Sequence, residues 1–395
     1  MFRHKIFNIC NFFILAYCGR VALSAYNASW ISALLMGIVL VMSLYFFVYA
    51  NCKYALPKFM KVLNAFIVLL VIYGIVNIAF GPTKVDIEGN IENKNAYLTT
   101  ALQSLLPIYS FYVFTRKGCL TVRTIQYMLP LFICLSVFEF TQMYQRRLLE
   151  ASLAGSSRTE FTNNVGYVFL SLLPLIALPF KRKWIQYTMW AVSLIYILLA
   201  VKRGAILISF FVLIYFILFS LRVSTPRQKL IVLFLSILLI SAGVYTLQDR
   251  LDNSEYFNSR IEDTRRGDTN SRNEIYSDIL NSYYQETNIL SIIFGRGANS
   301  TITISGFRAH NDWLQLLSDQ GALGILIYIC YFLALFSFWR SNKENEVVGG
   351  VIGIFIIVAF MRTLFSMSYA DYSMYMSMAI GFSAAYVKKQ PLLKR

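Results

Sequence analysis

Long apolar blocks separated by short polar segments dominate the chain. A run of about 20 residues with few charges is long enough to cross the hydrocarbon layer of a bilayer as an α-helix. The pattern therefore predicts an all-α polytopic integral membrane protein, because only helices of this kind satisfy their own backbone polar groups in lipid. Twelve transmembrane helices are expected, at residues 6–24, 31–50, 61–80, 97–115, 125–144, 164–180, 184–201, 204–221, 229–248, 321–339, 347–365 and 369–387.

One large polar segment interrupts this pattern between the ninth and tenth predicted spans, at about residues 249–308. Within it, Ile275, Ile279, Leu280 and Tyr283 recur at helical spacing, which predicts a small folded cap rather than a disordered linker. The chain is therefore divided into transmembrane helices 1–9 (1–248), the cap (249–308), and a histidine-motif helix with the last three spans (309–395). GRGANS (295–300) predicts a tight glycine turn. The alternative is that its backbone N–H groups form a phosphate cradle.

Composition supports the membrane class. The chain is 57% hydrophobic and 14% charged, whereas soluble domains are about 45–50% apolar and about 25% charged. The formal charge of +16 therefore indicates membrane topology rather than a nucleic-acid partner. Twenty of the 36 basic residues fall at alternate junctions between spans, and the positive-inside rule makes that side cytoplasmic, together with both termini.

The opposite side is rich in arginine: thirteen of its sixteen basic residues are Arg. Arginine presents a planar fork of donors that binds phosphate bidentately, so this bias favours a phosphate-bearing ligand on the outer face. The alternative is that these arginines pair with the nine acidic residues between Asp249 and Glu286. The six cysteines form no CxxC pair, and the sequence predicts neither a metal site nor another cofactor.

His310, one of two histidines in the chain, lies where the cap meets the tenth predicted span. Four features on the predicted outer face are candidates for chemistry: His310 with Asn311 and Asp312, Lys202 with Arg203, Arg158 with the amides that follow it, and Arg296 with Arg308. Ionisable residues near or inside spans are costly in a bilayer and usually face a cavity or a partner; here they are Arg20, Glu139, Arg362 and Asp371.

An imidazole titrates near neutrality, so His310 can take a proton from a hydroxyl group. Nearby arginines can hold a pyrophosphate and stabilise the charge that develops as it leaves. This pairing describes glycosyl transfer from a lipid-diphosphate sugar, or a lipid pyrophosphatase if water is the nucleophile. The structural alternatives are that His310 binds loop backbone, that Arg203 anchors to lipid headgroups, and that Glu139 and Arg362 form a buried pair.

Three sequence elements resemble the O-antigen polymerase and ligase superfamily. HNDWLQLLSDQGALG (310–324) is similar to its His-Asn-x-x-Leu…Gly-x-x-Gly motif, whose glycines, here Gly321 and Gly324, suit close packing. VKRGA (201–205) is similar to its Ser-Arg-Gly-Ala element, with Lys202 in place of the common serine. RTEFTNNVGY (158–167) is similar to its Arg-x-x-Gly/Phe…Asn-Pro-Asn element, with Asn-Val-Gly at its end.

The resemblance implies metal-independent polymerisation of undecaprenyl-pyrophosphate-linked O-antigen repeats at the periplasmic face of a bacterial inner membrane. It implies that His310 is the base and that Arg203 is catalytic. Residues expected to bind the pyrophosphate or glycan are Arg296, Arg308, Arg158, Lys202, Asn311 and Glu139. A chain-length regulator of the Wzz type is a candidate partner.

Two other functions stay open at this point. The O-antigen ligase of the same superfamily transfers the finished glycan to lipid A core with the same chemistry. A flippase or transporter of the lipid-linked oligosaccharide would instead show internal repeats and short loops. The large loop between the ninth and tenth predicted spans argues against that function.

Overall fold

The computed structural model describes residues 2–25, 29–85, 89, 91–153, 160–265, 272–369 and 373–389. These residues form helices throughout, and their only β-structure is one isolated bridge between Val85 and Ile91. The predicted all-α class is confirmed. Helices before the cap are α1 (Phe2–Ala25), α2 (Ser29–Lys53), α3 (Lys58–Phe80), α4 (Ala96–Leu105), α5 (Pro107–Arg116), α6 (Val122–Leu153), α7 (Gly166–Ile176), α8 (Lys183–Leu199), α9 (Arg203–Val223) and α10 (Pro226–Asn253).

The cap and the C-terminal part add seven more helices. They are α11 (Glu255–Arg265), α12 (Arg272–Tyr284), α13 (Ile289–Phe294), α14 (Ser300–Ser305), α15 (Asp312–Asn342), α16 (Val348–Phe365) and α17 (Met374–Lys389). The structure bears out a helical piece in the predicted cap, because α12 covers most of the SRNEIYSDILNSYY segment.

Seven of the described helices are long and apolar enough to cross a membrane: α2, α3, α6, α9, α10, α15 and α16. Shorter apolar stretches lie in α1 and α7. The chain is therefore a polytopic membrane protein, and the total of twelve spans stays a prediction. Each predicted span overlaps helix in the described residues, although 97–115 is divided into α4 and α5, and 164–180 is helical only over Gly166–Ile176. The division falls at Pro107, which has no N–H to continue the helical hydrogen bonds.

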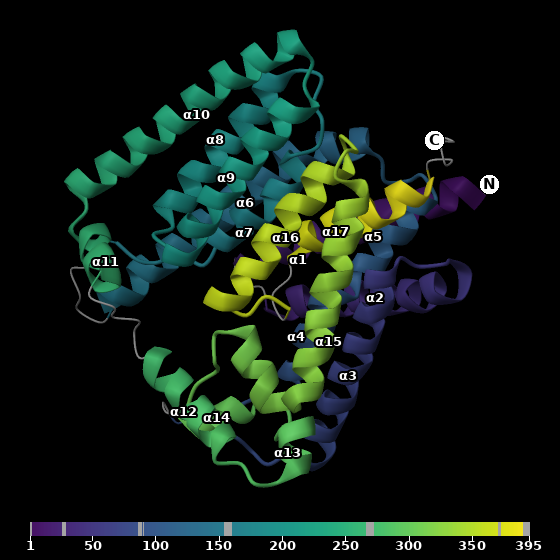
Figure 1. Cartoon of the computed structure of the whole chain (residues 1–395), viewed down its shortest axis with the longest axis vertical. Coiled ribbons are helices and arrows are strands. Elements are labelled where there is room, and N and C mark those ends of the chain that lie inside the picture. The colour runs from purple at the N-terminus through teal and green to yellow at the C-terminus, as the bar shows by residue number, and fades with distance from the viewer. Residues whose placement is uncertain are drawn as a thin grey trace.

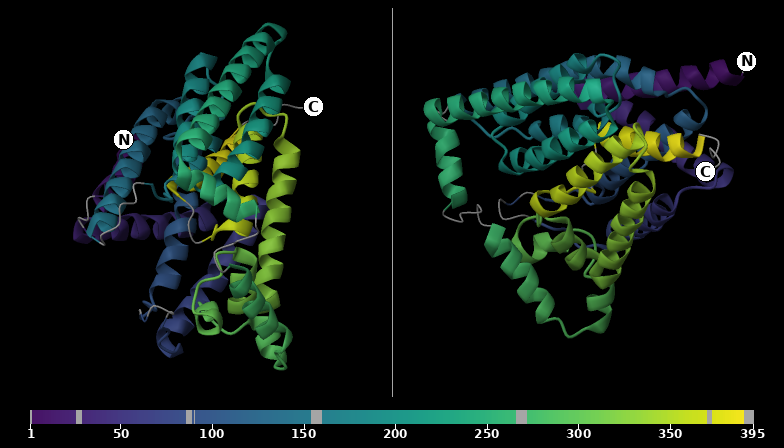
Figure 2. Two further views of the ribbon diagram at one scale, coloured as in Figure 1. Left: turned by 90° about the vertical axis from the view of Figure 1, so that its left-hand side faces the viewer. Right: turned by 45° about the horizontal axis from the view of Figure 1, so that its top comes forward.

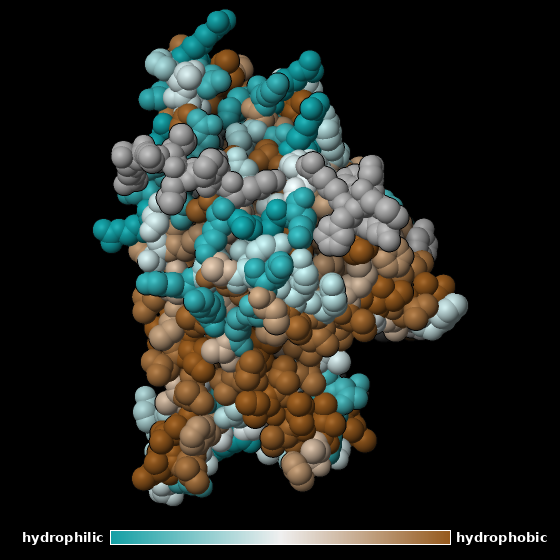
Figure 3. Space-filling model, turned by 90° about the vertical axis from the view of Figure 1, so that its right-hand side faces the viewer, coloured by the Kyte–Doolittle hydropathy of each residue, from teal (hydrophilic) through white to brown (hydrophobic). Residues whose placement is uncertain are grey.

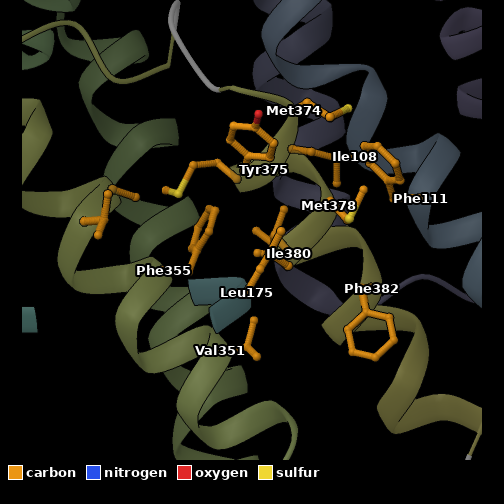
Figure 4. Close-up of a cluster of buried hydrophobic side chains, with 14 of the residues drawn as sticks. Ile108, Phe111, Leu175, Val351, Phe355, Met374, Tyr375, Met378, Ile380 and Phe382 are labelled. Carbon is orange, nitrogen blue, oxygen red and sulfur yellow. The ribbon is translucent and has the colours of Figure 1, made fainter. Parts of the chain in front are cut away.

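The helices pack in pairs that join distant parts of the chain: α3 with α15, α9 with α16, and α5 with α17 (Figure 1). The core lies where α5, α7, α16 and α17 meet. Figure 4 shows Leu175, Phe355 and Ile380 grouped there, with Phe111 beside Ile108, and all five are fully buried. At Gly381 an added Cβ would lie 2.3 Å from the carbonyl oxygen of Ile108, so glycine lets α17 approach the α5 backbone closely.

The cap is built around its own small core of Ile275, Ile279 and Ala309. Helices α12, α13 and α14 lie together beside the end of α3 and the start of α15 (Figure 1). By contrast, α11 turns away from the end of α10, which runs along one edge of the molecule (Figure 2). Helices α12 to α14 thus form a packed unit, and the bounds 249–308 of the cap stay a prediction.

Gly321 breaks α15 into two helical parts and lets the turn at Gly295 pack closely against this helix. Its backbone has φ 61° and ψ −154°, a region that essentially only glycine occupies. An added Cβ would lie 2.6 Å from both the backbone N of Gly295 and the carbonyl oxygen of Ile292. The close packing predicted for Gly321 is confirmed.

Replacing Gly321 with alanine should therefore destabilise the protein. Backbone strain alone costs about 1–3 kcal/mol, and the overlap with the turn at Gly295 adds to it. Thermal unfolding of the purified protein measures the effect. Gly37→Ala is the matched control, since nothing lies within 4 Å of its added Cβ. An unchanged Tm for Gly321→Ala would contradict the packing described here.

Candidate functional site

A polar cavity of about 550 Å³ lies where parts of the chain that are far apart in sequence converge. Four charged or titratable residues singled out in the sequence line it: His310, Lys202, Glu139 and Arg362. One further arginine, Arg272, lines the same cavity. The rest of its wall consists of Met143, Asn164, Val165, Tyr167, Val168, Ser171, Phe365, Ser366 and Ser373.

His310 is held at the cavity by the segment that begins α15. Its φ of 50° lies in the left-handed region, which is uncommon for residues other than glycine. The next residue, Asn311, caps α15 by accepting hydrogen bonds from the backbone N–H groups of Trp313 (2.9 Å) and Leu314 (3.2 Å). His310 keeps an exposed surface, and no described residue hydrogen-bonds to its imidazole. The ring nitrogens are therefore available to a ligand.

The environment favours a neutral imidazole. The pKa of His310 is lowered mainly because burial removes part of its water. The positive charges of Arg272, Lys202 and Arg308 lower this pKa further. Both causes penalise the protonated form. A neutral imidazole at physiological pH can accept a proton, so the site is electrostatically suited to a general base.

Lys202 reaches the cavity because of the sharp turn between α8 and α9. Val201 has φ 49°, a genuine outlier for a β-branched residue. Gly204 then lets α9 start close to the cavity wall, since an added Cβ would lie 2.5 Å from the Tyr167 hydroxyl. Arg203, at the first position of α9, is half-buried next to Lys202 but is not among the lining residues.

The other two cations come from the cap and from α16. Arg272, at the start of α12, donates a 3.2 Å hydrogen bond to the carbonyl oxygen of Phe365. Arg362 is 1% exposed, and its guanidinium lies 4.9 Å from the centre of the Tyr167 ring. Among the described lining residues these two and Lys202 are three cations, and Glu139 is one carboxylate, an excess that favours an anionic ligand.

The RTEFTNNVGY element forms one wall of the cavity. Asn163 is buried and joins this wall to two other parts of the chain. Its backbone N–H donates to the carbonyl oxygen of Ala200 (2.8 Å), and its side-chain amide donates to the carbonyl oxygen of Phe140 (3.2 Å). The following residues, Asn164 and Val165, line the cavity. Arg158, at the start of this element, lies outside the described residues, as does Asp371.

Two arginines that flank His310 in sequence are held elsewhere. Arg296 binds Glu286 (2.9 Å) and Ser282. This pairing is the alternative to phosphate binding that the sequence left open for the outer arginines. Arg308 binds Glu92 (3.0 Å), an acid of the segment between α3 and α4. Neither lines the His310 cavity, although the charge of Arg308 still acts on the imidazole.

The turn at GRGANS is structural. The backbone N–H groups of Arg296 and Gly297 donate to the carbonyl oxygens of Ser318 (2.9 Å) and Asp319 (3.0 Å). These groups are therefore already engaged in binding the cap to α15, which argues against a phosphate cradle.

Sequence reasoning did not single out Arg272 from the other loop arginines. The signal that could have found it is its position at the start of the one strongly helical piece of the cap, because the first residue of a packed helix is held in a fixed direction. Arg362 and Glu139 were noticed as isolated charges in apolar spans. The structure shows that they share one cavity.

Fold and site together describe a polytopic membrane protein with a cationic cavity that contains one histidine. Residues 188–329 match the family model described as O-antigen ligase. This stretch runs from α8 into α15 and includes Lys202, Arg272 and His310. This match supports the O-antigen polymerase and ligase superfamily, whose members are glycosyltransferase-like enzymes. Comparison with curated proteins gives no match.

The protonation of His310 can be observed directly, because the chain has two histidines and His4→Gln leaves one. In this variant, an NMR titration of labelled histidine should give a midpoint below the usual value of about 6.5. Adding Arg272→Gln should raise the midpoint, since it removes a positive charge that disfavours the imidazolium. Arg340→Gln, on the opposite end of α15, is the control. A midpoint above 6.5 before the change at Arg272 would contradict this electrostatic account.

Proposed function

We propose that the protein polymerises undecaprenyl-pyrophosphate-linked O-antigen repeat units at the periplasmic face of a bacterial inner membrane. The observation that carries this proposal is the arrangement of His310 with Lys202, Arg272 and Arg362 around one cavity. The family domain at residues 188–329 supports the same reaction class. In this proposal one lipid-linked chain is the donor, and the non-reducing-end hydroxyl of a lipid-linked repeat is the acceptor.

The chemistry is a single displacement at the anomeric carbon of the donor. A neutral ring nitrogen of His310 takes the proton of the acceptor hydroxyl, whose oxygen forms a bond to that carbon. The bond between the carbon and the pyrophosphate oxygen breaks, and the lipid pyrophosphate leaves with the electron pair. Attack opposite to the leaving group inverts the anomeric configuration. The proton on His310 then passes to solvent or to the released pyrophosphate.

The cations bind the leaving group in this proposal. Lys202, Arg272 and Arg362 supply positive charge where negative charge develops, which is the largest single contribution in many transfer reactions. Arg203 is placed to assist through its position beside Lys202. Glu139 can accept hydrogen bonds from sugar hydroxyl groups, and its carboxylate keeps the cavity from being uniformly positive.

A second function, the O-antigen ligase, is favoured by the description of the matching family model. The ligase uses the same donor and the same displacement, but its acceptor is a sugar of lipid A core. The residues of the cavity act on the donor and on a hydroxyl, so they serve both reactions. The acceptor has to be identified in cells.

Deletion of the gene, followed by gel analysis of lipopolysaccharide, separates the two functions. Loss of a polymerase should leave core with a single repeat, whereas loss of a ligase should leave bare core while lipid-linked polymer accumulates. A normal ladder after deletion would contradict both.

Complementation then tests the site. His310→Ala should fail to restore the ladder, with a loss of at least about 100-fold, because general base catalysis contributes about 10²–10⁴-fold. His4→Ala is the matched control, since it removes the only other histidine. Full restoration by His310→Ala at normal protein levels would overturn the assigned role.

A further inference from the structure

A second pocket, of about 850 Å³, lies between α3, the turn at Gly295–Ala298, α14 and α15. Its volume is within the range of small-molecule sites, about 300–1,000 Å³. It shares no lining residue with the His310 cavity. The two are therefore separate sites, and the pocket requires its own explanation.

Most of the pocket wall is apolar, formed by side chains such as Ile72, Val76, Phe294 and Leu323. Two of these belong to the membrane-crossing helix α3, and Leu323 belongs to α15, which also meets the criteria for a span. Hydrocarbon chains are the natural occupants of such a wall, because burial of apolar surface is favourable and needs no directional partner.

The pocket also faces an apolar surface that a bilayer must cover. Helix α13 buries none of its residues, and Ile289, Leu290 and Phe294 are largely exposed. This surface is continuous with Phe80 at the end of α3, which is 86% exposed and lines the pocket. Figure 3 shows apolar side chains over the lower part of the molecule, where Figure 1 places α3 and α15. Large exposed apolar patches of this kind mark a membrane contact.

The described lining contains two cations, Lys84 and Arg296, and no carboxylate. Lys84 donates a hydrogen bond to the carbonyl oxygen of Ala298, and loss of water lowers its pKa. The guanidinium of Arg296 is paired with Glu286 and Ser282, so Lys84 is the cation that the lining offers to an anion. Apolar walls with a cation at one side match a hydrocarbon chain that ends in a phosphate.

We propose that this pocket binds an anionic phospholipid of the surrounding bilayer, with an acyl chain along α3 and its phosphate at Lys84. The bilayer is the source because the pocket adjoins the lipid-covered face of α3 and α13 rather than the His310 cavity. The proposal goes beyond the proposed function and does not depend on it.

The site is linked to the candidate active site through one acidic residue. Glu92 accepts hydrogen bonds from Arg308 (3.0 Å) and Asn299 (2.7 Å), and its backbone N–H donates to the carbonyl oxygen of Lys84 (2.9 Å). The same short segment therefore joins a pocket-lining lysine to an arginine whose charge acts on His310.

The test uses the full chain in nanodiscs that contain phosphatidylglycerol with a photoreactive acyl chain. Cross-linked peptides should map to residues 69–84 and 294–304. Lys84→Gln should reduce this labelling by about tenfold, as expected for the loss of a charge-assisted phosphate contact, and Val76→Trp should reduce it by filling the pocket. Lys229→Gln, an exposed lysine on α10, is the matched control and should label normally.

Two comparisons identify the lipid. Photoreactive phosphatidylcholine should label the pocket less than phosphatidylglycerol does, and a short isoprenyl pyrophosphate should not compete. Equal labelling by the two phospholipids, or no effect of Lys84→Gln and Val76→Trp, would overturn the proposal. Competition by the isoprenyl pyrophosphate would overturn the choice of a bilayer phospholipid and assign the pocket to a lipid diphosphate. Since no readout involves glycosyl transfer, the result is independent of the catalytic role of His310.

Discussion

The buried carboxylate of Asp312 is the group on which the geometry around His310 depends. It is fully buried and accepts hydrogen bonds from the Tyr328 hydroxyl (2.6 Å) and from the backbone N–H of Ser368 (2.8 Å). A buried polar group without such partners costs several kcal/mol, so the start of α15 is held firmly to the segment after α16. That segment contributes Ser366 to the cavity, and His310 lies two residues before Asp312. One side chain therefore positions two walls of the site.

A second buried carboxylate, Asp319, fixes the cap to the same helix. Its Oδ1 atom accepts from the backbone N–H of Ser300 (2.9 Å), and its Oδ2 atom accepts from the Gln315 amide (2.8 Å). Gly321 then breaks the helix immediately after this network. Most of the HNDWLQLLSDQGALG stretch is thus structural. Its acids and amides hold the cap and the segment after α16 to α15, while His310 is the residue of this stretch that lines the cavity.

Hydrophobic periodicity predicted where helices form, because a membrane-crossing helix depends mainly on local composition. The periodicity did not predict the break at Pro107. The sequence is uniformly apolar there, but proline has no N–H for the helical hydrogen bond. Local sequence was less informative about the site. Arg296 and His310 are close in sequence, yet Glu286 holds that arginine at another pocket. Arg272, 38 positions before His310, lines the same cavity only because α12 packs onto the start of α15. Pairings of this kind arise from tertiary packing, which a single sequence does not reveal.

The most direct test of the central claim is a reconstitution of the purified protein in vesicles with a synthetic lipid-linked repeat as the only glycan. The account predicts chain elongation with release of one lipid pyrophosphate for each bond formed, an inverted anomeric linkage, and loss of both products in His310→Gln. Undiminished elongation by His310→Gln would contradict the role of the cavity, and glycan transfer only after addition of lipid A core would contradict polymerisation.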